Sequence, residues 1–109
     1  MNVVLTPEVK EYLNDLVTIL YEKGYFGTKE FSKRYVDALL DDIERNLPAR
    51  THKQAPPYFD KYGNDMEYAV FKKSKRTEWY VFFSAYLDDG EEIYLIRYIT
   101  NNHTAAQYL

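Results

Sequence analysis

Residues 78–99 read EWYVFFSAYLDDGEEIYLIRYI, and this stretch decides the fold class. Two runs rich in aromatic and β-branched residues flank Asp88-Asp89-Gly90, a turn sequence that favours a tight reversal of the chain. The pattern therefore predicts an antiparallel β-hairpin, with one strand over 78–86 and its partner over 91–100.

The first strand of this hairpin carries large side chains on both faces, since successive residues of a strand point to opposite sides of the sheet. Only one face can meet helices predicted upstream, so we expect the other face to be exposed and rich in tyrosine. Its expected members are Tyr80, Tyr86, Tyr94 and Tyr98. Such a face can stack nucleic-acid bases or bind a protein. The negative net charge favours a protein, either a partner or a second copy of the chain.

Upstream of the hairpin the apolar residues recur at helical spacing. Residues 2–5 are a short β-branched run typical of an opening strand. Thr6 then caps a helix that should run to about Lys23, where Gly24 ends it. Thr28 caps a second helix, which Pro48 ends. A short connection between two amphipathic helices indicates an antiparallel pair.

Residues 48–65 form a long irregular connection, which in a small domain is often functional. A strand over 66–71 and a charged turn over 72–76 lead into the hairpin. We therefore expect one α+β domain over residues 1–109, in the order β-α-α-β-β-β. It comprises a short N-terminal strand, an antiparallel helix pair, a three-stranded antiparallel sheet and a short C-terminal tail.

Composition limits the classes of protein that this chain can represent. The 109 residues include no cysteine, which excludes disulfides and thiolate chemistry. The N-terminus has no basic start, and no apolar run approaches the ~20 residues of a membrane span, so we expect a cytoplasmic protein without membrane contact. The net charge of −3 argues against indiscriminate binding of nucleic acid.

Four segments resemble the RelE/ParE superfamily, the toxins of bacterial type II toxin–antitoxin pairs. They are VLTPEV at 4–9, YVFF at 80–83, IYLIRYI at 93–99 and the terminal AAQYL at 105–109. The resemblance implies two helices packed on a twisted, mainly antiparallel sheet and a cognate antitoxin that wraps the protein. Members similar to RelE cut messenger RNA on the ribosome, and members similar to ParE inhibit DNA gyrase.

The resemblance also suggests catalytic residues. A RelE-like nuclease needs cations on the sheet and a tyrosine or histidine near the C-terminus, so the candidates are Tyr108, His103 and Arg97. The arginine expected on the middle strand falls at or near Tyr80, and the one expected past the last strand falls at 101–103, so both are replaced.

A basic cluster offers candidate contacts to RNA or phosphate, and its members are Lys72, Lys73, Lys75 and Arg76. Lysines at a hairpin turn are also common as solvated surface, and that explanation is the simpler one. Arg50, His52 and Lys53 in the long connection offer another source of cations, if they fold over the sheet. No spacing of ligands indicates a metal, and we expect no cofactor.

These features support two functional hypotheses. The first is a toxin-family component that binds a cognate antitoxin, with an endonuclease activity on messenger RNA, an action on gyrase, or an activity that has been lost. The second is a non-enzymatic module that binds a protein through a tyrosine-rich sheet face. A small partner reading frame beside the gene would favour the first.

Overall fold

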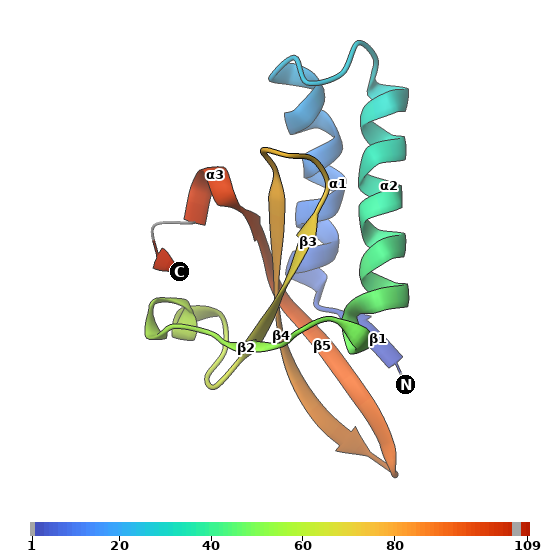
Figure 1. The fold of residues 1–109 in the computed structure, drawn as a ribbon. Helices are drawn as coiled ribbons and strands as arrows, with labels where there is room; N and C mark the ends of the chain where they lie inside the picture. Colours follow the sequence, from blue (N-terminus) through green and yellow to red (C-terminus); the bar gives the residue numbers. More distant parts are fainter. Residues whose placement is uncertain (1, 106–107) are drawn as a thin grey trace.

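The computed structural model describes residues 2–105 and 108–109 of the chain, and Figure 1 shows their path. The elements in chain order are β1 (Asn2–Leu5), α1 (Pro7–Glu22), α2 (Lys29–Asn46), the 3-10 turn η1 (Leu47–Ala49), β2 (Lys53–Gln54), the 3-10 helix η2 (Pro57–Tyr62), β3 (Glu67–Lys72), β4 (Glu78–Asp88), β5 (Glu91–Asn101) and α3 (Asn102–Ala105).

The strands form one sheet in the order β1-β5-β4-β3-β2. β1 runs parallel to β5, and the other neighbours are antiparallel. The α+β class is therefore confirmed, but the expected three-stranded sheet is wrong in detail. The opening strand joins the same sheet, and the long connection contributes a two-residue edge strand that its irregular composition did not reveal.

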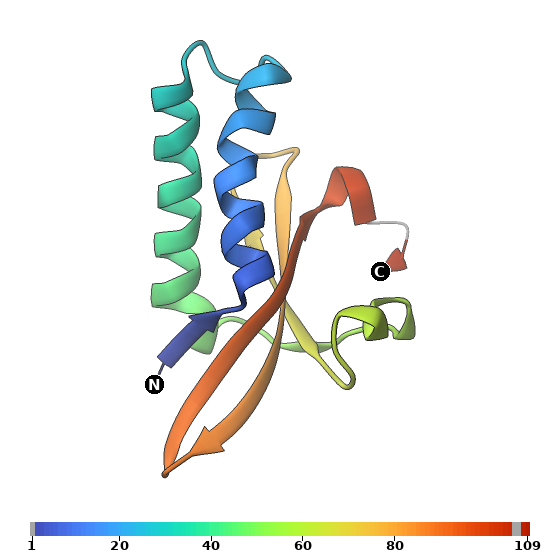
Figure 2. The ribbon, with the colours of Figure 1, turned by 180° about the vertical axis from the view of Figure 1, so that it is seen from behind.

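Both long helices begin where the sequence predicts. The Thr6 hydroxyl accepts a hydrogen bond from the Val9 N–H, and the Thr28 hydroxyl accepts one from the Phe31 N–H. The helices lie side by side on one face of the sheet (Figures 1 and 2). Leu39, Ile43 and other apolar side chains of the helices meet the sheet there, with the two named residues wholly buried. Among the described residues, no helix has the length and apolar content needed to cross a bilayer.

The opposite face of the sheet is also covered, which corrects the expected exposed tyrosine face. Phe59 of η2 stacks on Phe82 with ring centroids 4.3 Å apart, and Met66 and Ala105 complete a second apolar cluster. Tyr80, the position of the expected middle-strand arginine, belongs to this cluster and is 8% exposed. The long connection covers this face because it carries an apolar side chain, Phe59, that packs on the strands.

A β-bulge in β5 explains why the expected tyrosines do not share one face. Phe82 pairs with Tyr98 but Phe83 pairs with Ile96, so Arg97 is an extra residue in the ladder. The insertion reverses the alternation, and Tyr94 consequently packs in the helix-side core while Tyr98 lies on the other side.

The β4–β5 hairpin extends well beyond the rest of the sheet. β3 pairs with β4 only as far as Phe83, and β1 meets β5 only from Ile93 onward. Figures 1 and 2 show the remaining part projecting away from the helices. We call residues 84–92 the hairpin arm.

Candidate functional site

Two stacked tyrosine pairs lie close to Lys61. Tyr58 stacks on Tyr108 with centroids 3.6 Å apart, and Tyr62 stacks on Tyr98 at 3.8 Å, each pair within 5° of parallel. The Lys61 Nζ lies 4.0 Å from the centroid of Tyr58 and 5.6 Å from that of Tyr62. We call these five residues the tyrosine–lysine cluster. It combines aromatic faces with a cation, as single-stranded nucleic-acid sites do.

The local geometry of η2 places Lys61 over Tyr58. Side chains three residues apart are eclipsed in a 3-10 helix, and these two residues are three apart. Gly63 then lets η2 lie against β5. A Cβ there would be 2.6 Å from the Arg97 Nε, so any other residue would require the Arg97 side chain to move from its present position.

Arg97 is held beside the cluster by η2. As the extra residue of the bulge it reaches the Tyr62 carbonyl, which accepts a hydrogen bond from its Nε at 3.2 Å. The Nη groups form no hydrogen bond or ion pair with other described residues. A half-buried guanidinium with free donors is suited to binding a phosphate or carboxylate.

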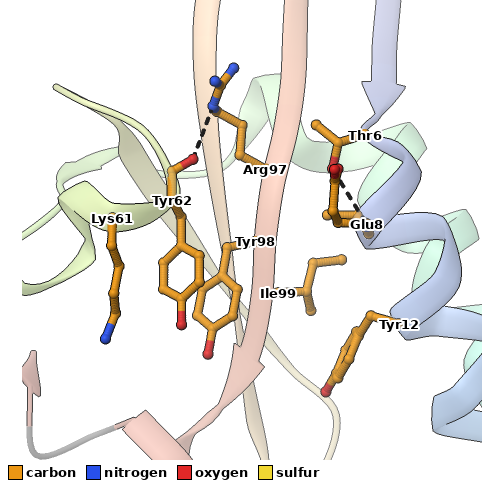
Figure 3. Close-up of a pocket in the computed structure, with 9 residues that line it drawn as sticks. Thr6, Glu8, Tyr12, Lys61, Tyr62, Arg97, Tyr98 and Ile99 are labelled. Carbon is orange, nitrogen blue, oxygen red and sulfur yellow. Dashed lines mark hydrogen bonds between the residues drawn. The ribbon is translucent and has the colours of Figure 1, made fainter.

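A pocket of about 480 Å³ adjoins the cluster, where α1 starts alongside β5. Lys61, Tyr62, Arg97 and Tyr98 line one side of it in Figure 3. Thr6, Glu8 and Tyr12 line the side formed by α1, and Glu8 is the one carboxylate among the described residues that line the pocket.

Two tyrosines of the pocket, Tyr12 and Tyr62, remain neutral over the physiological range. Burial, followed by the proximity of Tyr98, raises the pKa of Tyr12 to about 12. Burial and a hydrogen bond with Tyr98 raise the pKa of Tyr62 to about 12 as well. These phenols can donate protons but cannot serve as bases at neutral pH. Hydrogen bonds from Lys61 and Tyr108 instead lower the pKa of the exposed Tyr58.

His103 does not lie among these residues. It is exposed on α3 and lines a second pocket of about 410 Å³, in which Trp79, Ser74 and Thr77 also take part. Of the three predicted catalytic residues, Tyr108 belongs to the tyrosine–lysine cluster, and Arg97 bonds to the backbone of Tyr62 in that cluster. His103 is instead near the β3–β4 turn.

The four basic residues predicted to contact phosphate do not act alike. Lys73 forms an ion pair with Asp42 at 3.1 Å, and both side chains are about one-fifth exposed. It therefore links the β3–β4 turn to α2. Lys72, Lys75 and Arg76 are exposed at the surface.

The cations of the long connection do not replace the expected arginines. Arg50 lies over the ring of Phe71 at 4.7 Å, and His52 packs edge-on against Phe83 and Tyr94, all on the helix side of the sheet. Lys53 is exposed on β2. Within the described part of the chain, none of the three lies in the tyrosine–lysine cluster or lines the adjoining pocket.

Sequence reasoning missed Lys61, Tyr58, Tyr62, Tyr12 and Glu8. A signal existed in PPYFDKYG at 56–63, where aromatic residues and a lysine follow two prolines within the connection marked as functional. Glu8 and Tyr12 were read only as parts of a helix. Comparisons with family models, curated proteins and solved structures find no match to the chain.

Proposed function

We propose that this protein is the toxin-type component of a type II toxin–antitoxin pair, a divergent relative of the RelE/ParE superfamily that cleaves messenger RNA without a metal ion. A cognate antitoxin would neutralise it. The observation that carries the proposal is the position of Lys61 near one ring of each of two tyrosine stacks, in the lining of a pocket that also contains Arg97 and Glu8.

The arrangement of elements supports the relationship to this superfamily. A strand and two helices precede a run of antiparallel strands, and the first strand lies parallel to the last one. The resemblance in sequence implies two helices on a twisted, mainly antiparallel sheet, and this order is compatible with it. Fold alone does not establish activity, so the proposal depends on the site.

In this proposal, residues that line the pocket supply the three groups that metal-free RNA cleavage needs. Glu8 accepts the proton of the attacking 2′-hydroxyl, and Lys61 and Arg97 stabilise charge on the scissile phosphate. A phenol of the pocket, Tyr12 or Tyr62, donates a proton to the leaving 5′-oxygen. The exposed stack of Tyr58 and Tyr108 supports a neighbouring base.

One observation favours the alternative of a non-enzymatic protein-binding module. The sheet face where the resemblance places catalytic arginines is filled by Phe59, Met66 and Phe82. A protein that had lost nuclease activity, or that acts on gyrase, would have no need of an open face there.

Induced expression with transcript mapping tests the proposal. We expect the wild type to arrest growth and cut transcripts. Glu8→Gln and Lys61→Ala should lower cleavage by roughly 100-fold each, as loss of a proton-transfer or charge-stabilising group does. Glu11→Gln is the matched control, since Glu11 is exposed on the same helix and does not line the pocket.

The same experiment separates this site from the one expected from sequence. His103→Ala should retain cleavage because His103 lies in the second pocket, and Tyr108→Phe should retain it because the stacked ring remains. Intact growth and transcripts in the wild type would refute the nuclease proposal, and a supercoiling assay would then test gyrase. Co-expression with a small neighbouring reading frame should restore growth if an antitoxin exists.

A further inference from the structure

The hairpin arm has a strand edge that no other described element covers. Residues 84–88 of β4 pair with β5 alone, because pairing with β3 stops at Phe83. The arm is also apolar at its surface: Leu87 is 73% exposed and Tyr86 is 48% exposed. A free strand edge with exposed apolar side chains is a template for another strand.

The turn determines which backbone groups face outward. Asp88 pairs with Glu91 across a two-residue turn in which Asp89 and Gly90 both have positive φ, at 53° and 78°. In such a hairpin the residues flanking the turn exchange hydrogen bonds, and the bonding direction alternates along the strand. The N–H and C=O groups of Ala85 and Leu87 therefore point away from β5, toward solvent.

The charge of the arm selects the partner. Four acidic residues fall within five positions of the turn, Asp88, Asp89, Glu91 and Glu92. No lysine, arginine or histidine occurs between Arg76 and Arg97. A second copy of the chain would bring an equally acidic arm to the contact, whereas a basic segment would be attracted.

We infer that the hairpin arm is a docking site for a protein partner that contributes a basic, extended segment, which pairs with β4 along residues 84–88 as an additional strand. The outward groups of Ala85 and Leu87 supply main-chain hydrogen bonds. Tyr86 and Leu87 supply apolar contact, and the acidic turn attracts basic side chains. This function is separate from RNA cleavage and needs none of the residues of the tyrosine–lysine cluster.

A fluorescent nine-residue peptide of alternating lysine and valine is the probe, with binding to the full-length protein followed by anisotropy. We expect saturable binding that weakens strongly at about 1 M salt, where the Debye length falls to about 3 Å. The same peptide with alternate backbone nitrogens methylated should bind at least roughly tenfold more weakly, because it cannot extend the sheet. A peptide with glutamate in place of lysine should not bind.

Variants of the protein locate the contact. Leu87→Pro removes one outward N–H without touching the ladder to β5, and it should weaken binding by roughly tenfold. Asp88→Asn with Asp89→Asn keeps a turn-compatible sequence and should weaken binding at low salt only. Lys75→Ala with Arg76→Ala, at the other end of β4, is the matched control and should bind as the wild type does.

Three results would overturn the inference. The first is no binding of the lysine–valine peptide by the wild type. The second is that the N-methylated peptide binds as tightly as the unmethylated one. Because this comparison changes only the peptide, it needs no control for folding of the protein. The third is concentration-dependent self-association in sedimentation that Leu87→Pro abolishes, since the occupant would then be a second copy. None of these results bears on transcript cleavage, so the two proposals fail independently.

Discussion

The two turns at the ends of β4 differ in charge and in how firmly they are held. The β3–β4 turn is basic and anchored: Asn102 bonds to the backbone of Arg76 and Glu78 where the turn enters β4, and Lys73 pairs with Asp42 of α2. The β4–β5 turn is acidic and projects from the sheet as part of the hairpin arm (Figure 2). A turn sequence thus specifies local geometry, whereas anchoring depends on side chains from other elements.

Removing the anchor should have the largest effect. Asn102 accepts from the Glu78 N–H and donates to the Arg76 carbonyl, both at 3.0 Å. Asn102→Ala leaves these partners without their bonds and should lower the free energy of unfolding by about 2 kcal/mol in urea denaturation. Asp88→Ala at the β4–β5 turn should change the free energy of unfolding by less than about 0.5 kcal/mol. Equal effects of the two substitutions would remove the distinction between the turns.

The β4–β5 turn requires a left-handed backbone conformation at Gly90. Gly90 has a φ of +78°, so Gly90→Ala should destabilise the protein by about 1–2 kcal/mol, the cost of a left-handed conformation for a residue with a Cβ. A Cβ at Gly27 meets nothing within 4 Å and its φ is not in the left-handed region, so Gly27→Ala is the control and should be neutral or stabilising. Thermal melts of both variants measure the difference.

The ion pair at the anchored turn should depend on pH. Partial burial opposes ionisation of Asp42, but hydrogen bonds from Asn46 and Lys73 and the nearby charge of Arg50 dominate and lower its pKa. The stabilisation is therefore present above the unfolded pKa of the carboxyl and is lost as pH falls through the lower folded value.

Asp42→Asn should accordingly lower the free energy of unfolding by about 0.5–1 kcal/mol at neutral pH, with the difference from wild type vanishing in acid. Asp41→Asn is the matched control because its partner, Arg45, is exposed on the same helix, and it should show a smaller effect. A difference that persists below the folded pKa of Asp42 would show that the charge is not its cause.

Neutralising the acidic turn should have the smallest effect on stability. Asp88→Asn with Asp89→Asn relieves repulsion among neighbouring carboxylates and should change the free energy of unfolding by less than about 0.5 kcal/mol, toward greater stability at low salt. Chemical denaturation at two salt concentrations measures it. A clear loss of stability would mean that the turn is anchored after all.

The elements that depend on local pattern were predictable. Asp88-Asp89-Gly90 located the hairpin, and Thr6 and Thr28 located the helix starts. The bulge at Arg97 was not predictable, because one inserted residue leaves an apolar run unchanged yet reverses the faces beyond it. The cover of the second sheet face was also missed, since it depends on tertiary contacts of Phe59 in a connection without periodicity.

The candidate site was predicted only in fragments for the same reason. The sequence indicated Arg97 and Tyr108 as candidates. Lys61, which lies over the ring of Tyr58 and is adjacent to Tyr62, the partner of Arg97, is far from both in the sequence. His103 was a candidate because histidine is a common acid or base in catalysis, and residue type carries no information about position in the fold. Spatial convergence of a 3-10 helix, a bulge and a terminal tail has no short-range signature.

Residue-resolved amide hydrogen exchange by NMR tests the contrast between the two ends of β4 most directly. We expect slow exchange at Glu78, whose N–H is bonded to Asn102. In the arm, exchange should alternate, being fast at Ala85 and Leu87 and slower at Ser84 and Tyr86. Adding the lysine–valine peptide should slow Ala85 and Leu87 alone. Slow exchange of these two amides in the protein alone would show that the strand edge is already occupied, and the arm would then have no free edge for a partner.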